Sequence, residues 1–141
     1  TELAEANLLN GKEFEGYFID AGTPTAWMEG VQRCIREERF NTGSAVDGTW
    51  YAKQSDYPSA TIRGSMIEAD VLIEQASIVS STLLAHTKVG LNAQISNSLV
   101  GRSATIGRDV ILDGVVVDHD SSIPDGTVQE GGQWPKVDTA A

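Results

Sequence analysis

Aliphatic side chains recur along the second half of the chain with a period of 16 or 17 residues. A first set is spaced by 16, 17 and 17 residues and comprises Ile73, Val89, Ile106 and Ile123. A second set lies six residues after the first three members of the first set, at Val79, Ile95 and Leu112, and Ile62 adds a member one period earlier. A third set follows eleven residues after the first and comprises Ile67, Leu84, Val100 and Val117. Because every member is Ile, Val or Leu, the period predicts a repeated structural unit.

The repeat predicts a triangular coil whose three faces are short strands. Each strand places one bulky side chain inside, and coils stacked ~4.8 Å apart align like residues in interior ladders. Gly90 and Gly107 directly follow members of the first set, where a tight corner favours glycine. Small or short side chains recur four residues after that set, at Ser77, Ala93, Val110 and Thr127. An antiparallel sandwich is the alternative, but it gives no reason for a period of 17 residues.

Two irregularities modify this expectation. One coil is a residue short, and the spacing places the tighter corner between Leu84 and Val89, at residues 85–88. The tail, residues 129–141, contains two adjacent glycines and a proline and is expected to form a loop that folds back over the last coil. Trp134 would then cap the exposed end, which is otherwise an open strand edge.

The segment before the repeat predicts a strand, a turn and a helix. An apolar run, Tyr17–Ile19, is followed by an acidic turn, and Thr23 with Pro24 then forms a helix N-terminus. An apolar face spaced by four residues continues the helix to about residues 41–43, through Trp27, Val31 and Ile35. We therefore expect residues 1–55 to hold the strand–turn–helix segment and a linker, residues 56–128 the β-helix, and residues 129–141 the tail.

Asp20, at the end of the expected strand, has two interpretations. A carboxylate between a strand and a helix can lie at the rim of an active site and bind a metal. The simpler interpretation is a solvated turn aspartate that accepts hydrogen bonds from the backbone N–H groups that follow it. The spacing of the residues favours the turn.

Charge and composition exclude several classes of partner. The chain has 10 Lys+Arg against 20 Asp+Glu, a net charge of −10, which would repel nucleic acid and anionic membranes. Its single cysteine, Cys34, forms no internal disulfide, and no apolar run reaches the ~20 residues of a membrane span. We expect a cytoplasmic protein.

The ladder positions resemble the hexapeptide-repeat family of left-handed parallel β-helices, over about residues 56–128. The resemblance implies a mainly β fold, a left-handed parallel β-helix of about four coils preceded by the short strand–turn–helix segment. Flat β-helix faces commonly pack side by side, so it also implies a homo-oligomer, a dimer or a trimer.

The turn resembles the signature of sugar-nucleotide pyrophosphorylases, with matches at Phe18, Asp20, Gly22, Thr23 and Pro24. These enzymes include mannose-1-phosphate guanylyltransferases and glucose-1-phosphate nucleotidyltransferases, and in them a left-handed β-helix follows the motif. The resemblance implies a C-terminal region of such an enzyme, which joins a sugar 1-phosphate to a nucleoside triphosphate and releases pyrophosphate with Mg²⁺. It also implies a metal-binding role for Asp20.

The family's glycine-rich phosphate loop, of the type Gly-x-Gly-Thr-Arg, does not occur in this sequence. We therefore expect this chain alone to be inactive and to need no cofactor, and we expect the β-helix to serve assembly or regulation.

Two other classes of function stay open. His86 and His119 lie two residues past members of the third set, in equivalent corners, with Arg102 at the same position between them. Hexapeptide acyltransferases use a histidine as general base on acetyl-CoA, so the two histidines are candidates for that chemistry. The simpler interpretation is two exposed corner residues. The remaining alternative is a non-enzymatic oligomerisation module.

Overall fold

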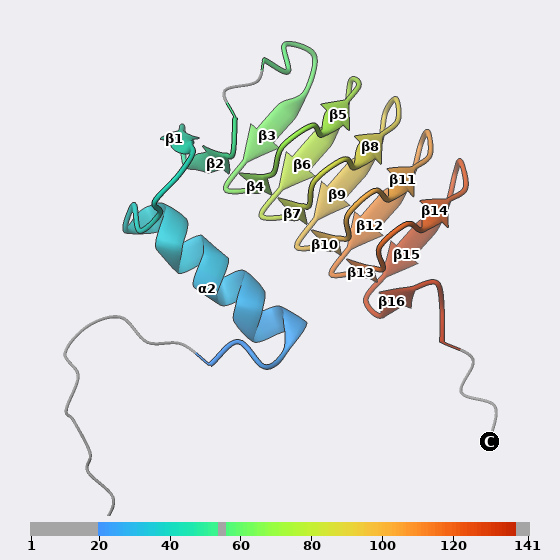
Figure 1. Cartoon of the computed structure of the whole chain (residues 1–141). Helices are drawn as coiled ribbons and strands as arrows, with labels where there is room; N and C mark the ends of the chain where they lie inside the picture. The colour runs from blue at the N-terminus through green and yellow to red at the C-terminus, as the bar shows by residue number, and fades with distance from the viewer. Residues whose placement is uncertain (1–19, 54–55, 138–141) are drawn as a thin grey trace, which may run out of the picture.

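The computed structural model describes residues 20–53 and 56–137, which form a parallel β-solenoid of about five turns with one helix beside it (Figure 1). The helix is α2, Pro24–Arg36. Successive strands follow the three faces in turn, as the repeat predicts, so the expected hexapeptide β-helix is confirmed. In the described residues no helix is long and apolar enough to cross a membrane.

The three faces are the three sheets of the solenoid. Face A begins with an antiparallel hairpin and continues in parallel, through β1 Ser44–Val46, β2 Thr49–Tyr51, β4 Met66–Ile67, β7 Thr82–Leu83, β10 Leu99–Val100, β13 Val116–Val117 and β16 Gln133–Trp134. Face B is parallel throughout and contains β3 Thr61–Arg63, β6 Ser77–Val79, β9 Gln94–Ser96, β12 Ile111–Asp113 and β15 Val128–Glu130. Face C is also parallel and contains β5 Leu72–Ile73, β8 Lys88–Val89, β11 Thr105–Ile106 and β14 Ser122–Ile123.

One interior ladder runs down each face, and strand pairing identifies its members. The ladder of face C is the expected one, from Ile73 to Ile123. On face B the buried member is Ile78, and on face A it is Leu83. The expected members Val79 and Leu84 are each wrong by one residue, since Val79 is on the outer side, 36% exposed. Ser77 is wrong in the same way, because Ala76 aligns with Ala93 at the buried corner.

The cause of these shifts is the position of the short corner. Ile73 and Ile78 are five residues apart, whereas Val89 and Ile95, on the next coil, are six apart. The missing residue therefore falls in the corner between faces C and B, at residues 74–77, and the expected position at residues 85–88 is wrong. The equivalent corners of the later coils contain a left-handed residue, at Asn92, Asp109 and Gly126, and the short corner contains none.

Gly90 and Gly107 are required by close approach between coils, and the expected reason, a tight turn, is wrong. Neither glycine has a positive φ. A Cβ on Gly90 would lie 2.9 Å from the carbonyl carbon of Gly107 on the next coil. A Cβ on Gly101 would lie 2.6 Å from the backbone nitrogen of His119. Glycine thus lets neighbouring coils keep their spacing at these points.

A ladder of buried hydroxyl groups connects the coils at the corner between faces B and A. The Oγ of Ser65 accepts from the N–H of Ser81, the Oγ of Ser81 from Ser98, and the Oγ of Ser98 from Val115, at 3.0–3.1 Å. Thr49 begins the ladder by accepting from the N–H of Ser65 at 3.3 Å. These serines are fully buried, so each hydroxyl satisfies a backbone N–H that the strand ladders leave without a partner.

Aromatic side chains close both ends of the solenoid. Tyr51 and Tyr57 stack on each other and pack against the core at the N-terminal end, where the Tyr57 hydroxyl donates to the Val71 carbonyl at 2.8 Å. Trp134 packs against the core at the other end, as expected, but it does so from strand β16, paired with Val117, and not from a loop folded back over the last coil. The coil continues past residue 128, because the first part of the expected tail forms β15 and β16.

Helix α2 lies alongside face A, with its axis along the direction in which the coils stack (Figure 1). Thr23 is its N-cap and Pro24 its first residue, as expected, and the Thr23 hydroxyl accepts from the N–H of Ala26 at 3.1 Å. The helix ends at Arg36, several residues before the expected end, because Glu38 has a left-handed φ of 52° and turns the chain. The expected strand Tyr17–Ile19 lies outside the described residues.

Candidate functional site

In the turn before α2, Asp20 is arranged as a turn aspartate, which is the simpler of its two interpretations. Its Oδ1 accepts a hydrogen bond from the N–H of Gly22 at 3.2 Å, and the residue is exposed. This is the arrangement of a turn aspartate, which tightens the chain just before the helix begins. The N–H of Ala26 in the first helical turn donates to the Thr23 hydroxyl, so the two side chains together set the start of α2.

The residues around Asp20 do not fit Mg²⁺ on their own. Mg²⁺ requires near-octahedral oxygen coordination, usually with one or two carboxylates and oxygens from the substrate phosphates. No group of three or more His, Cys, Asp or Glu side chains that could hold a metal occurs in residues 20–53 and 56–137. One exposed carboxylate already used by a backbone N–H is not a metal site, so the metal role of Asp20 stays a prediction that needs groups from elsewhere.

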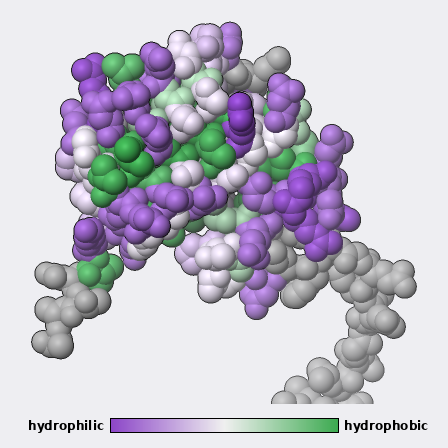
Figure 2. Space-filling view, turned by 180° about the vertical axis from the view of Figure 1, so that it is seen from behind, coloured by the Kyte–Doolittle hydropathy of each residue, from purple (hydrophilic) through white to green (hydrophobic). Residues whose placement is uncertain are grey.

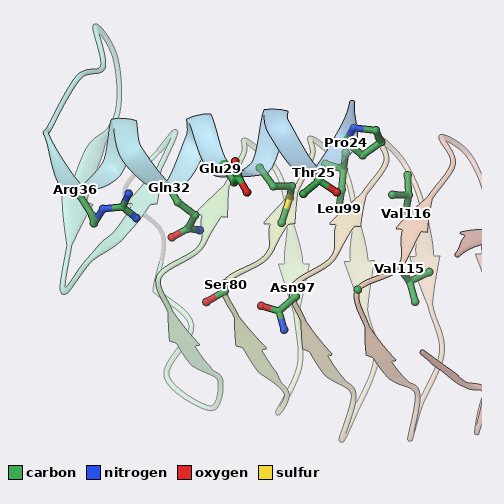
Figure 3. Close-up of a pocket in the computed structure, with 12 residues that line it drawn as sticks. Pro24, Thr25, Glu29, Gln32, Arg36, Ser80, Asn97, Leu99, Val115 and Val116 are labelled. Atoms are coloured by element: carbon green, nitrogen blue, oxygen red, sulfur yellow. The ribbon is translucent and has the colours of Figure 1, made fainter. Parts of the chain in front are cut away.

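A groove of about 470 Å³ lies between one flank of α2 and the corner of faces B and A (Figure 3). Glu29, Gln32 and Arg36 line it from the helix, and Ser80 and Asn97 from the corner. Its apolar lining includes Met28 from the helix and Leu99 and Val116 from face A. The Gln32 side-chain N–H donates to the Gly64 carbonyl and so ties the helix to the solenoid. The groove offers charged and amide groups for binding a polar ligand. Its lining contains no His or Cys, and no hydrogen bond among the described residues joins its hydroxyl groups, Thr25 and Ser80, to the Glu29 carboxylate.

The sequence gives no sign of this groove. Its two walls are more than forty residues apart in the chain and meet only because α2 packs on face A. The polar positions of the helix, 29, 32 and 36, follow a helical period, which indicates a shared flank but not what that flank faces.

Three arginines gather around the end of α2. Arg33 donates to one oxygen of the Glu37 carboxylate at 2.8 Å, and Arg39 donates to the other. These hydrogen bonds, that from Arg33 first, hold the pKa of Glu37 below its usual value. Arg36 lies on the intervening turn and lines the groove. The last turn of the helix holds Arg33 and Arg36, whose positive charges suit the helix dipole, and the two acidic residues that follow, Glu37 and Glu38, offset part of that charge.

The two histidines lie along one edge of the solenoid but are not equivalent, so that expectation is wrong. Backbone hydrogen bonds align His86 with Asp70, Ser103 and Asp120, all in the left-handed region. His119 aligns instead with Arg102, whose N–H donates to its Nδ1 at 2.8 Å. The difference has the same cause as the ladder shifts, since His86 follows Leu83 by three residues and His119 follows Val117 by two.

The surroundings of the two histidines do not form a built catalytic pocket. The His86 side chain is 60% exposed, with its Nδ1 at 4.0 Å from a carboxylate oxygen of Asp70. His119 is exposed and lies at the edge of an open groove of about 430 Å³, whose other side chains are apolar apart from Asp118. A general base needs a nucleophile or substrate group held within hydrogen-bond reach, and the described residues place none beside either ring.

The chain is similar to curated enzymes over most of its length. It is 26% identical over 132 residues to a protein named glucose-1-phosphate adenylyltransferase from Bacillus thuringiensis (strain Al Hakam), which covers 89% of this chain and 35% of that enzyme. A glucose-1-phosphate adenylyltransferase from Bacillus mycoides (strain KBAB4) is 27% identical over 134 residues, with the same coverage. The chain thus spans about a third of the length of the relatives it matches.

These names bear on the two enzyme types that the turn motif suggested. Both relatives carry the name of a glucose-1-phosphate enzyme, so the comparisons do not support the mannose-1-phosphate type. No solved structure matches the chain significantly. The chain is a hexapeptide β-helix region that resembles the C-terminal part of glucose-1-phosphate adenylyltransferase. Residues 50–137, more than half of the chain, match the family described as "GlmU-like, C-terminal hexapeptide", and the chain belongs to that family.

Proposed function

We propose that this chain forms the C-terminal part of a sugar-1-phosphate nucleotidyltransferase of the glucose-1-phosphate type. The observation that carries the proposal is the extent of the similarity. It covers 89% of the chain, whereas the β-helix family accounts only for residues 50–137. The similarity therefore includes α2 and its preceding turn, and a β-helix shared by chance with many other proteins would not extend into them.

In such an enzyme the chemistry belongs to a preceding nucleotide-binding domain. A sugar 1-phosphate attacks a nucleoside triphosphate, the new phosphate–phosphate bond forms as the bond to pyrophosphate breaks, and Mg²⁺ supplies charge neutralisation when bound. The described residues offer neither a phosphate-binding loop nor a metal cluster. The role of this chain is assembly or regulation in the cytoplasm, and the chain alone releases no pyrophosphate.

The assembly role has a candidate surface in face B. Its outer side is a flat five-stranded sheet with three exposed aliphatic side chains, Val79, Ile111 and Val128. Figure 2, which views the molecule from the side of face B, shows hydrophobic atoms in a band between polar ones. Face A is occupied by α2, whereas face B carries no element of the described chain. We propose that face B packs on a second copy and gives a dimer or a trimer.

Light scattering at micromolar concentration tests the assembly. The chain is expected to have the mass of a dimer or trimer, and the double variant Ile111→Lys, Val128→Lys is expected to be a monomer. The matched control is Leu72→Lys on face C, where the side chain is 61% exposed and the mass should not change. A monomeric unmodified chain would refute the assembly role.

The gene upstream of Thr1 tests the enzyme assignment. An in-frame continuation that encodes a glycine-rich phosphate loop is expected, and a stop codon directly before a start at this position would contradict the assignment. The product of the longer frame should release pyrophosphate faster from glucose 1-phosphate with ATP than from mannose 1-phosphate with GTP. The reverse preference would restore the mannose-1-phosphate type.

A further inference from the structure

A groove lies on each flank of α2, and the two grooves differ in chemistry. The one beside Trp27 and Cys34 has a volume of about 350 Å³, and no charged residue lines it. The larger groove, at the corner of faces B and A, combines charged and polar side chains of the helix with residues of the solenoid corner. Because the coils stack at a fixed distance, the solenoid wall of this larger groove has a regular spacing.

That wall is a row of corner residues. One residue of each coil turns the corner between faces B and A in the left-handed region of φ: Gly64, Ser80, Asn97, Gly114 and Gly131. The strands that follow these residues pair in parallel and in register, so the five residues stack in a row. Gly114 lines the groove although it has no side chain, so the row presents its backbone there.

Amide side chains bind the carbonyl groups at the two ends of this row. The Gln32 side-chain N–H donates to the Gly64 carbonyl, and the Gln129 side-chain N–H donates to the Gly131 carbonyl at 2.9 Å. The backbone N–H groups of the last four residues of the row donate to the preceding coil, at 2.7–3.1 Å. The carbonyl groups of the row are therefore the groups that bind donors from outside the strand ladders.

The three carbonyl groups between these ends accept no hydrogen bond from the described residues. They belong to residues that line the groove, Ser80, Asn97 and Gly114. Because successive coils lie ~4.8 Å apart, the groove has three open acceptors at that spacing. The Asn97 side chain adds a fourth, because its amide N–H donates to Asp113 at 2.9 Å and its Oδ1 has no donor among the described residues.

The helical wall places a carboxylate across from these acceptors. Glu29 lines the groove from the middle of α2, facing the row (Figure 3), and forms no ion pair within the described residues. Arg36, the cation of the lining, lies about 10 Å further along the helix. Apolar side chains fill the space between the polar groups: Met28, Leu99 and Val116. The middle of the groove is therefore rich in acceptors, negative and partly apolar.

We propose that the middle of this groove binds an aliphatic polyamine whose amino groups are three carbons apart. Two nitrogens joined by three methylene groups lie about 5 Å apart in an extended chain, which matches the spacing of the corner carbonyls. Each ammonium group donates to one carbonyl, the methylene groups contact the apolar side chains, and Glu29 offsets part of the charge. The net charge of −10 favours such a cation, and the site is independent of the enzyme assignment.

Isothermal titration calorimetry of the full chain with bis(3-aminopropyl)amine tests the site. We expect saturable binding of one triamine per chain. The matched ligand is bis(5-aminopentyl)amine, whose nitrogens lie about 7.5 Å apart, midway between one and two coil spacings. It should bind at least fivefold more weakly. Equal affinities, or no saturable binding, would overturn the proposal, because an acidic chain attracts any polycation without regard to spacing.

Three variants locate the site, each with a urea midpoint equal to that of the unmodified chain as the sign of folding. Glu29→Gln should weaken binding of bis(3-aminopropyl)amine about threefold, as for an exposed ion pair. The matched control is Glu74→Gln, an exposed carboxylate outside the groove, which changes the net charge equally and should leave the affinity within about 1.5-fold. Arg36→Gln should strengthen binding, because it removes a like charge.

Two results from these variants would overturn the site. Equal losses in Glu29→Gln and Glu74→Gln would show that the triamine binds the acidic surface in general. Weaker binding in Arg36→Gln together with stronger binding in Glu29→Gln would show that the groove prefers an anion.

Discussion

Replacing Ser81 by alanine tests the hydroxyl ladder at the corner between faces B and A. The Ser81 Oγ accepts from the N–H of Ser98 at 3.1 Å and donates to the carbonyl of Val79 at 2.8 Å. The Val79 carbonyl keeps a partner in the variant, because it also accepts from the N–H of Asn97 at 3.1 Å. The N–H of Ser98 has no other acceptor among the described residues. The substitution therefore leaves one buried donor without a partner.

The expected cost follows from that single donor. A buried polar group that loses its only hydrogen bond costs about 1–3 kcal/mol. The site is fully buried in the middle of the stack, where water cannot reach the N–H without separating two coils. We therefore expect a loss of about 2 kcal/mol, which for a domain of this size lowers the Tm by roughly 6–12 °C.

Thermal and urea denaturation followed by circular dichroism measure the loss, with Ser121→Ala as the matched control. The Ser121 hydroxyl lies near the His119 carbonyl at 3.5 Å, and it accepts no hydrogen bond from a backbone N–H of the described residues. A surface change of this kind should alter stability by less than ~0.5 kcal/mol. If Ser81→Ala and Ser121→Ala are equally stable, the ladder does not stabilise the fold and the reasoning is refuted.

Three further changes examine packing and charge. Gly101→Ala places a Cβ 2.6 Å from the backbone of the next coil and should lower the free energy of unfolding, measured in urea, by about 3 kcal/mol. Gly126→Ala meets open space but has a φ of +73°, and it should lower the free energy of unfolding by only ~1 kcal/mol. Equal losses in the two variants would contradict the close approach of the coils at Gly101. Thr82→Val removes a buried hydroxyl that has no hydrogen-bond partner among the described residues and should raise stability by about 1 kcal/mol, so a lower Tm would show that the hydroxyl is bonded. The hydrogen bond from Arg33 lowers the pKa of Glu37, so its stabilising effect is present above the pKa of the unfolded carboxyl and is lost as pH falls through the folded value. A carboxyl titration by NMR should give a lower midpoint in the folded chain than in urea, and equal midpoints would contradict it.

The architecture could be predicted from the sequence alone because the regular spacing of aliphatic residues defines it. A core made of one aliphatic residue per strand is visible as soon as like residues recur at a fixed distance, and no contact between distant segments is needed to see it. The register of the side chains in the interior ladders was harder to predict. One residue is missing between Ile73 and Ile78, and a second aliphatic residue directly follows each of the next two ladder members, Val79 after Ile78 and Leu84 after Leu83. Hydropathy alone cannot tell which of two adjacent aliphatic residues faces inward.

The grooves beside α2 could not be predicted, for a different physical reason. The apolar face of the helix was expected, but Trp27 and Cys34 lie on a flank that remains open, and Ile35 is buried. Which part of an amphipathic face is covered depends on how the helix sits on the sheet, and that depends on packing between segments far apart in the chain. For Asp20, the spacing already favoured the turn that the structure shows.

The 16-residue coil has a consequence for how this chain can change through insertions and deletions. A deletion inside a strand would move every later side chain of that strand to the opposite side of its sheet. The deletion at residues 74–77 instead removes only the left-handed corner residue, and the next strands pair in register with their neighbours. Single-residue deletions and insertions should therefore be tolerated at the three corners of the coil and selected against in the strands. Variation in chain length should be confined to these corners.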